Sequence, residues 1–223
     1  MLERGIQFCG WKVRAILKGA GQTRRIINPQ PILVAGKTWE WPCESRHDRP
    51  GPCDPVSKAS WADGVNPGDC MTRFAAYPVG TIIYIRETWG DLNADHPRCP
   101  DGRKPQPGDR IVYRANPADD YQWGSGKPSQ GSFCWRSGRF MPRWAARPWR
   151  GIVTAVRAER LQEITEQDAQ AEGVAPLQFH EGHIPEVATY IGGFARAWDD
   201  LHGPGAWAQN PWVFPYTFEE CRP

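Results

Sequence analysis

The chain has 223 residues, which is enough for one elaborated domain with a sizeable hydrophobic core. Its 27 basic and 25 acidic residues give a formal net charge of +2, so the total charge indicates neither a nucleic-acid nor a membrane partner. No stretch reaches the roughly 18 uninterrupted apolar residues of a membrane span. The first residues, with Glu3 before Arg4, lack the basic segment of a signal peptide. These features predict a cytoplasmic protein with no membrane partner.

Tryptophan, proline and glycine are frequent, with 12, 22 and 23 residues respectively. Prolines and glycines interleaved with aromatic residues are typical of short strands joined by many turns. Some tryptophans belong in a core because each buries a large area, and others are candidates for stacking on bases. The seven cysteines are odd in number and form no C-x-x-C pair, which predicts free thiols.

In chain order, the first predicted element is a short amphipathic helix over residues 8–18, which ends at Gly19. A glycine-bearing turn is predicted over residues 19–25, and Ile26–Ile27 begin a strand. Residues 28–78 show little periodicity and are interpreted as a long irregular insertion rich in tryptophan, proline and cysteine.

Runs of β-branched and apolar residues predict strands at 79–89, 110–115 and 150–161, the second of which lies within another insertion, residues 90–137. Helices are predicted at 165–173 and 186–202.

A final strand is predicted at residues 212–218, where Pro215 favours an edge or a bulge. Strands separated by irregular loops, with few helices and no internal repeat, indicate a single α+β domain over residues 1–223. The order of the elements favours a barrel over an alternating βαβ sheet.

Four segments carry a resemblance to a known family. They read ILKGAGQTRR (16–25), IRETW (85–89), FMPRWA (140–145) and RLQEITEQDAQAEG (160–173), and NPWV (210–213) fits with them. The first is similar to a signature written G-x-K-x-x-T-x-R. Together the segments resemble the ASCH family of the PUA-like superfamily, in particular its long members from bacteriophages and prophages. They occur in a consistent order along nearly the whole chain.

The resemblance implies a PUA-like β-barrel with flanking helices, in a protein encoded by a phage or prophage and present in the bacterial cytoplasm. It also implies a cleft beside the signature loop that binds RNA or modified bases. Some small bacterial members of the family are amidohydrolases that remove an acyl group from N4-acetylcytidine. They use a lysine and a threonine of the signature loop and a glutamate of the later helix.

Carried over residue by residue, the family threonine matches Thr23, the trailing arginine matches Arg25 and the glutamate matches Glu172. The lysine has no match, because the segment between Gly19 and Thr23 is one residue shorter than the signature. Without that ammonium group, recognition is favoured over hydrolysis. The candidate substitutes are Lys18, Arg24 and Arg25.

Each of these positions also has a purely structural interpretation. In that interpretation the Thr23 hydroxyl only forms a hydrogen bond with a backbone group of a turn, and Glu172 is a solvated acid at a helix end. Glu87, next to Trp89, would need a partner such as Arg24 or Arg114 if it faces inward, and would then be a functional candidate. The alternative for Glu87 is a surface pair at a strand edge.

Residues 134–160 contain seven arginines against one acid, Glu159, with tryptophans interleaved. This combination is expected at a surface that binds phosphates and bases. The alternative is that the arginines lie over aromatic rings and pair locally. The candidates for backbone contacts are Arg143, Trp144 and Arg147.

A structural zinc is a further alternative to the prediction that the protein has no cofactor. The possible ligands fall in the first insertion, at spacings that match no recognised zinc finger. They are Cys43, His47, Cys53 and Cys70.

Three hypotheses for the function follow. The first is a binding module that holds RNA, single-stranded DNA or a modified nucleoside in a cleft. The second is an amidohydrolase acting on an N-acylated nucleoside, with Thr23 as nucleophile and Glu172 as base. The third is a phage accessory protein that binds a host protein. The residues expected to form the cleft are Thr23, Arg24, Arg25, Glu87 and Glu172, and Trp89 is a further candidate for ligand binding.

Overall fold

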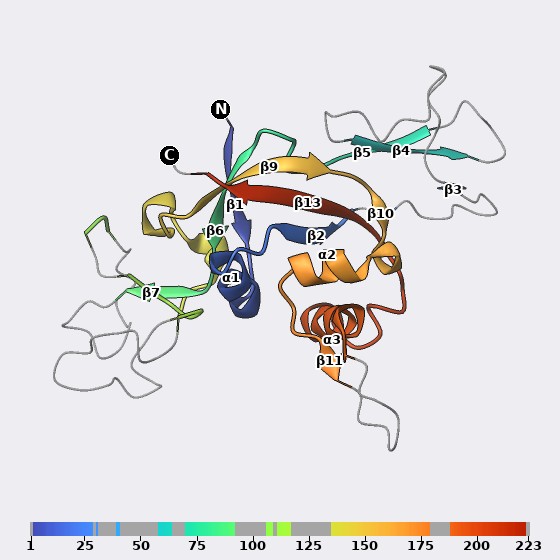
Figure 1. Ribbon diagram of the computed structural model, residues 1–223. Coiled ribbons are helices and arrows are strands. Elements are labelled where there is room, and N and C mark those ends of the chain that lie inside the picture. Colours follow the sequence, from blue (N-terminus) through green and yellow to red (C-terminus); the bar gives the residue numbers. More distant parts are fainter. Residues whose placement is uncertain are drawn as a thin grey trace.

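The structure is a computed structural model, and the residues that it describes are 2–28, 30, 39–40, 58–63, 70–91, 106–108, 111–116, 135–178 and 188–221. Its main feature is a six-stranded sheet, in which the long strand β13 pairs with three other strands (Figure 1). The strands follow the order β1-β6-β9-β13-β10, and β2 also pairs with β13. They comprise β1 (Glu3–Gln7), β2 (Gln22–Ile26), β6 (Ile82–Arg86), β9 (Arg150–Val156), β10 (Glu159–Arg160) and β13 (Trp212–Glu220).

The sheet is mixed, because β1 runs parallel to β6 whereas the other pairs are antiparallel. With few helices beside it, this arrangement confirms the predicted α+β class. Within the described ranges the strand pairs form an open sheet, and they do not show the closed barrel that the resemblance implies.

Three α-helices lie on one side of the sheet, below it as drawn in Figure 1. They are α1 (Gly10–Leu17), α2 (Glu166–Ala171) and α3 (Tyr190–His202). None of the helices in the described part of the chain is long and apolar enough to cross a membrane. Among the described residues, three short 3-10 turns connect other elements, at Gly138–Phe140, Arg143–Ala145 and Leu161–Glu163.

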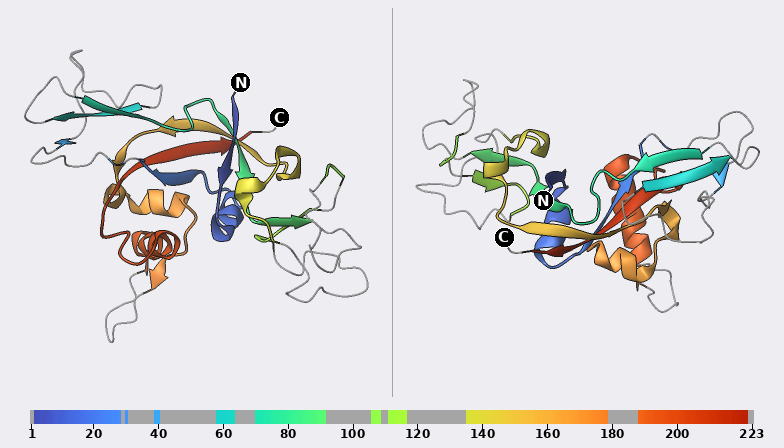
Figure 2. Two further views of the ribbon diagram at one scale, coloured as in Figure 1. Left: turned by 180° about the vertical axis from the view of Figure 1, so that it is seen from behind. Right: turned by 90° about the horizontal axis from the view of Figure 1, so that it is seen from above.

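Two small sheets extend from opposite ends of the main sheet (Figure 2). The three-stranded one contains β3 (Trp39–Glu40), β4 (Lys58–Asp63) and β5 (Cys70–Phe74). The two-stranded one contains β7 (Trp89–Asp91) and β8 (Ile111–Tyr113). A third pair, β11 (Leu177–Gln178) and β12 (Ala188–Thr189), lies beside α3.

The buried apolar residues form one large cluster between the sheet and α1, a second cluster around α2 and α3, and a small third cluster beside β7 and β8. In β6 the buried residues alternate, so Ile83 and Ile85 face the first cluster. Full burial of one such side chain contributes about 1.5–3 kcal/mol. In α3 the pair Phe194 and Trp198, four positions apart, faces the second cluster. The pocket described below lies where α1 meets α2 and α3.

Several predicted elements have different bounds in the structure. The first helix is confirmed, but the predicted turn over 19–25 is wrong in its second half, because β2 begins at Gln22. A long-range pairing explains this, since Thr23 lies opposite Tyr216 of β13. The predicted strands 79–89 and 150–161 are each divided into two. The two predicted insertions lie largely outside the described residues.

The final strand is present, but it is not an edge strand of the sheet, and its pairing with β9 is irregular between Thr217 and Phe218, just after Pro215. Pro215 pairs with Arg24 of β2 on one side. On the other side, the pairing of β13 with β10 ends at Val213, and its pairing with β9 begins at Tyr216. Pro215 therefore occupies the point where the neighbouring strand changes, where a missing N–H is tolerated.

Both later helices begin with a threonine cap. The Thr165 hydroxyl accepts a hydrogen bond from the backbone N–H of Asp168, as expected for an N-cap, and Thr189 caps α3 in the same way. The helix predicted at 186–202 begins later, at Tyr190, after β12. The Asp168 carboxylate faces β2, where it accepts a hydrogen bond from the Gln22 side chain.

Candidate functional site

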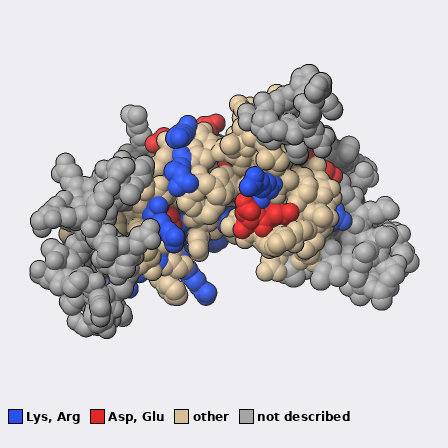
Figure 3. Space-filling view, turned by 90° about the horizontal axis from the view of Figure 1, so that it is seen from below, with Lys and Arg blue, Asp and Glu red and all other residues tan. Residues whose placement is uncertain are grey.

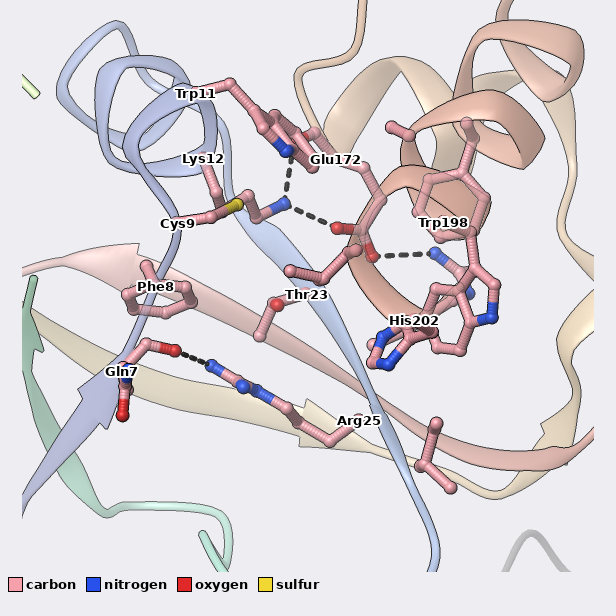
Figure 4. Close-up of a pocket in the computed structure, with 15 residues that line it drawn as sticks. Gln7, Phe8, Cys9, Trp11, Lys12, Thr23, Arg25, Glu172, Trp198 and His202 are labelled. Atoms are coloured by element: carbon pink, nitrogen blue, oxygen red, sulfur yellow. Dashed lines mark hydrogen bonds and ion pairs between the residues drawn. The ribbon is translucent and has the colours of Figure 1, made fainter. Parts of the chain in front are cut away.

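A cavity of about 270 Å³ lies between α1, β2, the end of α2, and α3 (Figure 4). Its walls combine charged groups with aromatic rings. The charged or polar side chains include Lys12, Thr23, Arg24, Arg25, Glu172 and His202, and the rings include Phe8, Trp11, Phe194 and Trp198.

Strand β2 supplies four consecutive residues, Thr23 to Ile26, to this cavity. Side chains alternate along a strand, so Thr23 and Arg25 leave one face of β2 and Arg24 leaves the other. Arg24 reaches the carboxylates of Glu159 and Glu172, while the guanidinium of Arg25 lies over the Phe8 ring. The antiparallel ladder with β13 holds this segment in place.

The ammonium group of Lys12 is buried against Glu172. It contacts the Glu172 carboxylate and donates a hydrogen bond of 2.6 Å to the backbone carbonyl of Glu172. That carbonyl belongs to the residue that ends α2, where backbone acceptors lack partners within the helix. Burial lowers the pKa of Lys12, although the negative charge of Glu172 opposes this effect. Lys12 is therefore easier to deprotonate than a lysine in water.

Arg24 joins Glu172 to two further acids. Its side chain is fully buried and lies 3.0 Å from Glu172, 2.9 Å from Glu159 and 3.2 Å from Asp168. Arg157 closes the network from the outside, at 2.6 Å from Glu159 and 3.1 Å from Asp168. Burial alone would raise the pKa of Asp168, but the hydrogen bond from Gln22 and these two guanidinium groups hold it below its usual value.

Thr23 lies near the Lys12–Glu172 pair in the close-up view (Figure 4). Its side chain is buried, and no hydrogen bond joins its hydroxyl to another described residue. Across the cavity, burial lowers the pKa of His202, and the positive charge of Arg25 lowers it further. An uncharged imidazole is thus favoured on that wall.

The structure brings four of the sequence-predicted residues into one cavity, namely Thr23, Arg24, Arg25 and Glu172. The alternative interpretation of Glu172 as a solvated surface acid is wrong, since only 2% of the residue is exposed. The interpretation of Thr23 as a hydrogen-bonding turn residue is also wrong, because it lies within β2.

Lys12 is the residue that motif comparison missed. It does not stand in the signature loop but comes from α1, eleven positions before Thr23 in the printed sequence. A signal was present, because Lys12 lies four positions after Phe8 and four before Ile16, both of which are buried. A lysine within the apolar stripe of a short helix needs a buried partner.

Glu87 and Trp89 do not line this cavity. Glu87 is buried and pairs with Arg147 at 2.5 Å, so the predicted partners Arg24 and Arg114 are wrong. Arg147 also lies over the Tyr113 ring, with its guanidinium carbon 4.1 Å from the ring centre. Trp89 is buried against Met141 and Ala145. These residues form a separate cluster beside β7 and β8.

Arg143 and Trp144 lie on the surface away from the cavity. Arg143 forms an ion pair with Glu3, although 61% of its side chain is exposed. Trp144 is 39% exposed and Phe140 is 73% exposed. On the face shown in Figure 3, a band of basic side chains lies left of the centre, and a cluster of acidic side chains lies right of the centre next to a second basic patch. Several arginines of the segment 134–160 form ion pairs, as the alternative interpretation expects. They are Arg143, Arg147, Arg150 and Arg157.

No cluster of three or more metal-binding side chains occurs within the part of the chain that the structure describes. Three of the possible zinc ligands, Cys43, His47 and Cys53, lie outside the described residues, and so does the side chain of Cys70. Cys9 and Cys221 are free thiols, as predicted.

Comparisons of the chain with protein-family models, with curated proteins and with solved structures found no match.

Proposed function

We propose that this cavity is the active site of an amidohydrolase that removes an acyl group from an N-acylated nucleobase or nucleoside. The observation that carries the proposal is the burial of Lys12 against Glu172 in the cavity that Thr23 lines. We further propose that the chain is a phage-type ASCH protein with a PUA-like fold. The signature segment runs from α1 through β2, and the later segment runs from β10 to the end of α2. Both contribute side chains to this cavity.

The size and lining of the cavity favour a single base over a polynucleotide. Its volume of about 270 Å³ is close to the lower limit of typical ligand pockets, roughly 300 Å³. The aromatic residues of its lining, Phe8, Trp11, Phe194 and Trp198, provide an apolar environment suited to a heteroaromatic ring. Buried polar groups beside these rings would orient the substituents of such a base.

The chemistry requires a nucleophile and a proton acceptor. In the proposed reaction the hydroxyl oxygen of Thr23 attacks the acyl carbonyl carbon, and its proton passes to unprotonated Lys12. The C–N bond then breaks, the proton moves to the departing amino group, and the acyl group remains on Thr23 as an ester. Water hydrolyses this ester, releases the carboxylic acid and restores the hydroxyl. Glu172 orients Lys12 throughout.

The lowered pKa of Lys12 suits this role, because a general base works best when its pKa is near the working pH. The lysine that the signature loop lacks would thus be replaced by one from α1. The ammonium form of Lys12 would also stabilise negative charge on the acyl oxygen.

Incubation with N4-acetylcytidine, followed by chromatography of the released cytidine, tests the proposal. We expect Thr23→Val, which removes the hydroxyl but keeps the shape, to lower the rate at least ~100-fold. Lys12→Met is expected to cause a similar loss. The matched control is Thr154→Val, which replaces an exposed threonine on β9. Release of cytidine by Thr23→Val at the wild-type rate would refute the mechanism.

A second candidate function is recognition of an RNA or single-stranded DNA segment by the surface around residues 135–144. The observation that favours it is the exposure of Trp135, Phe140 and Trp144 next to Arg143. It predicts binding that weakens as salt rises. Affinity for a labelled oligonucleotide that is the same for wild type and for Arg143→Gln/Trp144→Ala would exclude this surface. A host-protein partner remains a separate prediction, tested by nuclease-resistant pull-down.

A further inference from the structure

The ion-pair network around Arg24 contains equal numbers of positive and negative groups. Each of its members contacts at least one group of opposite charge. With Lys12 protonated, three cations therefore face three carboxylates. The cations are Lys12, Arg24 and Arg157, and the anions are Glu159, Asp168 and Glu172.

Arg25 lines the same cavity but stands outside this network. It forms no ion pair with any carboxylate in the described ranges. One terminal nitrogen donates a hydrogen bond to the backbone carbonyl of Gln7, and the guanidinium carbon lies 5.2 Å from the centre of the Phe8 ring. Its Nε is buried and has no hydrogen-bond partner among the described residues. Arg25 is therefore a cation of the cavity lining that contacts no described carboxylate, although the charge of Glu172 acts on it through space.

Such an arrangement is unfavourable in an empty cavity. A buried donor without an acceptor costs roughly 1–3 kcal/mol, and more when the group is charged. Arginine does not escape this cost by losing its proton, because its guanidinium stays charged in proteins. The charge also acts across the cavity, where it contributes to the lowered pKa of His202. A ligand that brought an anionic group would remove the penalty.

We propose that Arg25 binds an anionic oxygen group of the ligand, either a phosphate or a carboxylate. The planar guanidinium matches the two oxygens of such a group, and its Nε and one terminal nitrogen form the donor pair for it. This inference rests on the function proposed above, and it leaves two classes of substrate. One is an N-acylated nucleotide, and the other is a nucleoside whose acyl chain ends in a carboxylate.

The position of Arg25 relative to Thr23 supports this assignment. The two residues are separated by one position on the same face of β2, so their Cα atoms are about 6.6 Å apart at the usual rise of a strand. The anionic group and the scissile carbonyl would therefore belong to one small molecule. Neither group needs a polymer to reach its site.

Isothermal titration of the full chain with four probes tests the inference. The probes are cytidine, cytidine 5′-monophosphate, N4-succinylcytidine and inorganic phosphate. We expect one of the two charged cytidine compounds to bind at least ~10-fold more tightly than cytidine, which corresponds to about 1.4 kcal/mol. A preference for the monophosphate would identify a phosphate group, and a preference for the succinyl compound would identify a carboxylate.

Variants assign the preference to Arg25. Arg25→Gln should bring the charged probes to within ~2-fold of cytidine, and Arg25→Lys should keep part of the preference because it keeps the charge. Arg14→Gln is the control, since Arg14 is an exposed cation of α1 outside the cavity lining. It should leave all four affinities unchanged.

Two results would overturn the inference. One is equal affinity of the wild-type protein for cytidine and both charged compounds, which needs no variant. The other is a charge preference that survives in folded Arg25→Gln. If N4-acetylcytidine is not hydrolysed but phosphate binds in an Arg25-dependent manner, the proposed reaction fails and the anion site stands. If hydrolysis occurs without any charge preference, the anion site fails and the reaction stands.

Discussion

Lys12 and Glu172 are 160 positions apart in the sequence, yet the Lys12 ammonium group contacts both the carboxylate and the backbone carbonyl of Glu172. This contact joins α1, near the start of the chain, to the end of α2. Both residues are nearly inaccessible to solvent. A charged pair in such a place is costly to desolvate, so its geometry and its surrounding hydrogen bonds decide whether it is tolerated.

Loss of the Glu172 charge should destabilise the protein strongly. Glu172→Gln leaves Lys12 and Arg24 without one of their buried anions, and removal of one partner from a buried pair typically costs about 3–5 kcal/mol. Urea unfolding measures the change. Glu220→Gln, at the exposed end of β13, serves as the control and should stay within about 0.5 kcal/mol of wild type. A change as small as the control would contradict the buried network.

The hydrolytic rate should rise with pH as Lys12 loses its proton. Its pKa in the folded protein lies below the reference value of 10.5, so the rise should level off before that pH is reached. The measurement is the initial rate with N4-acetylcytidine, corrected with Thr23→Val for hydrolysis without the enzyme. Lys12→Arg, which stays protonated, should lack this rise. A profile shared by wild type and Lys12→Arg would show that another group is the base.

Low pH should lower the stability of the folded protein because Asp168 becomes protonated. Its pKa is lowered in the folded state, so its stabilising contribution is complete above the unfolded value of 3.8 and is lost as pH falls through the folded value. Asp168→Asn should therefore reduce stability at neutral pH, by about 1 kcal/mol for this partly exposed group. It should also flatten the decline of stability below about pH 4. Urea midpoints measured from neutral to acidic pH test both effects, and parallel curves for the two proteins would contradict them.

Arg147 should stabilise the folded protein because it neutralises the buried carboxylate of Glu87. Arg147→Met leaves the Glu87 carboxylate buried without its cation, with an expected loss of about 3–5 kcal/mol. The double variant Arg147→Met/Glu87→Leu should recover most of that loss, because an apolar pair of similar volume often replaces a buried ion pair at little cost. Thermal unfolding of both variants tests this. If the double variant is as unstable as the single one, the pair is not what stabilises this cluster.

Gly193 allows α3 to approach the segment that follows α2. A Cβ at this position would lie 2.0 Å from the backbone carbonyl oxygen of Ala175. Replacement of glycine by alanine inside a helix normally stabilises a protein by about 1 kcal/mol. Here Gly193→Ala should instead lower the melting temperature, while Arg196→Ala on the exposed side of α3 should not. An increase with Gly193→Ala would show that the helix can move away.

Local patterns in the sequence determined much of the secondary structure. The helix at Gly10–Leu17, the alternating strand around Ile83 and Ile85, and the cap of α2 at Thr165 all follow from residue spacing. Such features depend on neighbours within a few positions, so the sequence alone predicts them. Residue spacing did not single out Thr23 and Glu172, which became candidates through the resemblance to a family signature.

Only the tertiary structure decided which charges meet. The pairing of β2 with β13 turned a predicted loop into a strand, and it placed Arg24 among three acids that are distant in sequence. Lys12 entered the cavity because α1 packs next to the end of α2. Ion pairs between segments more than a hundred positions apart depend on the packing of whole elements, which no local spacing encodes.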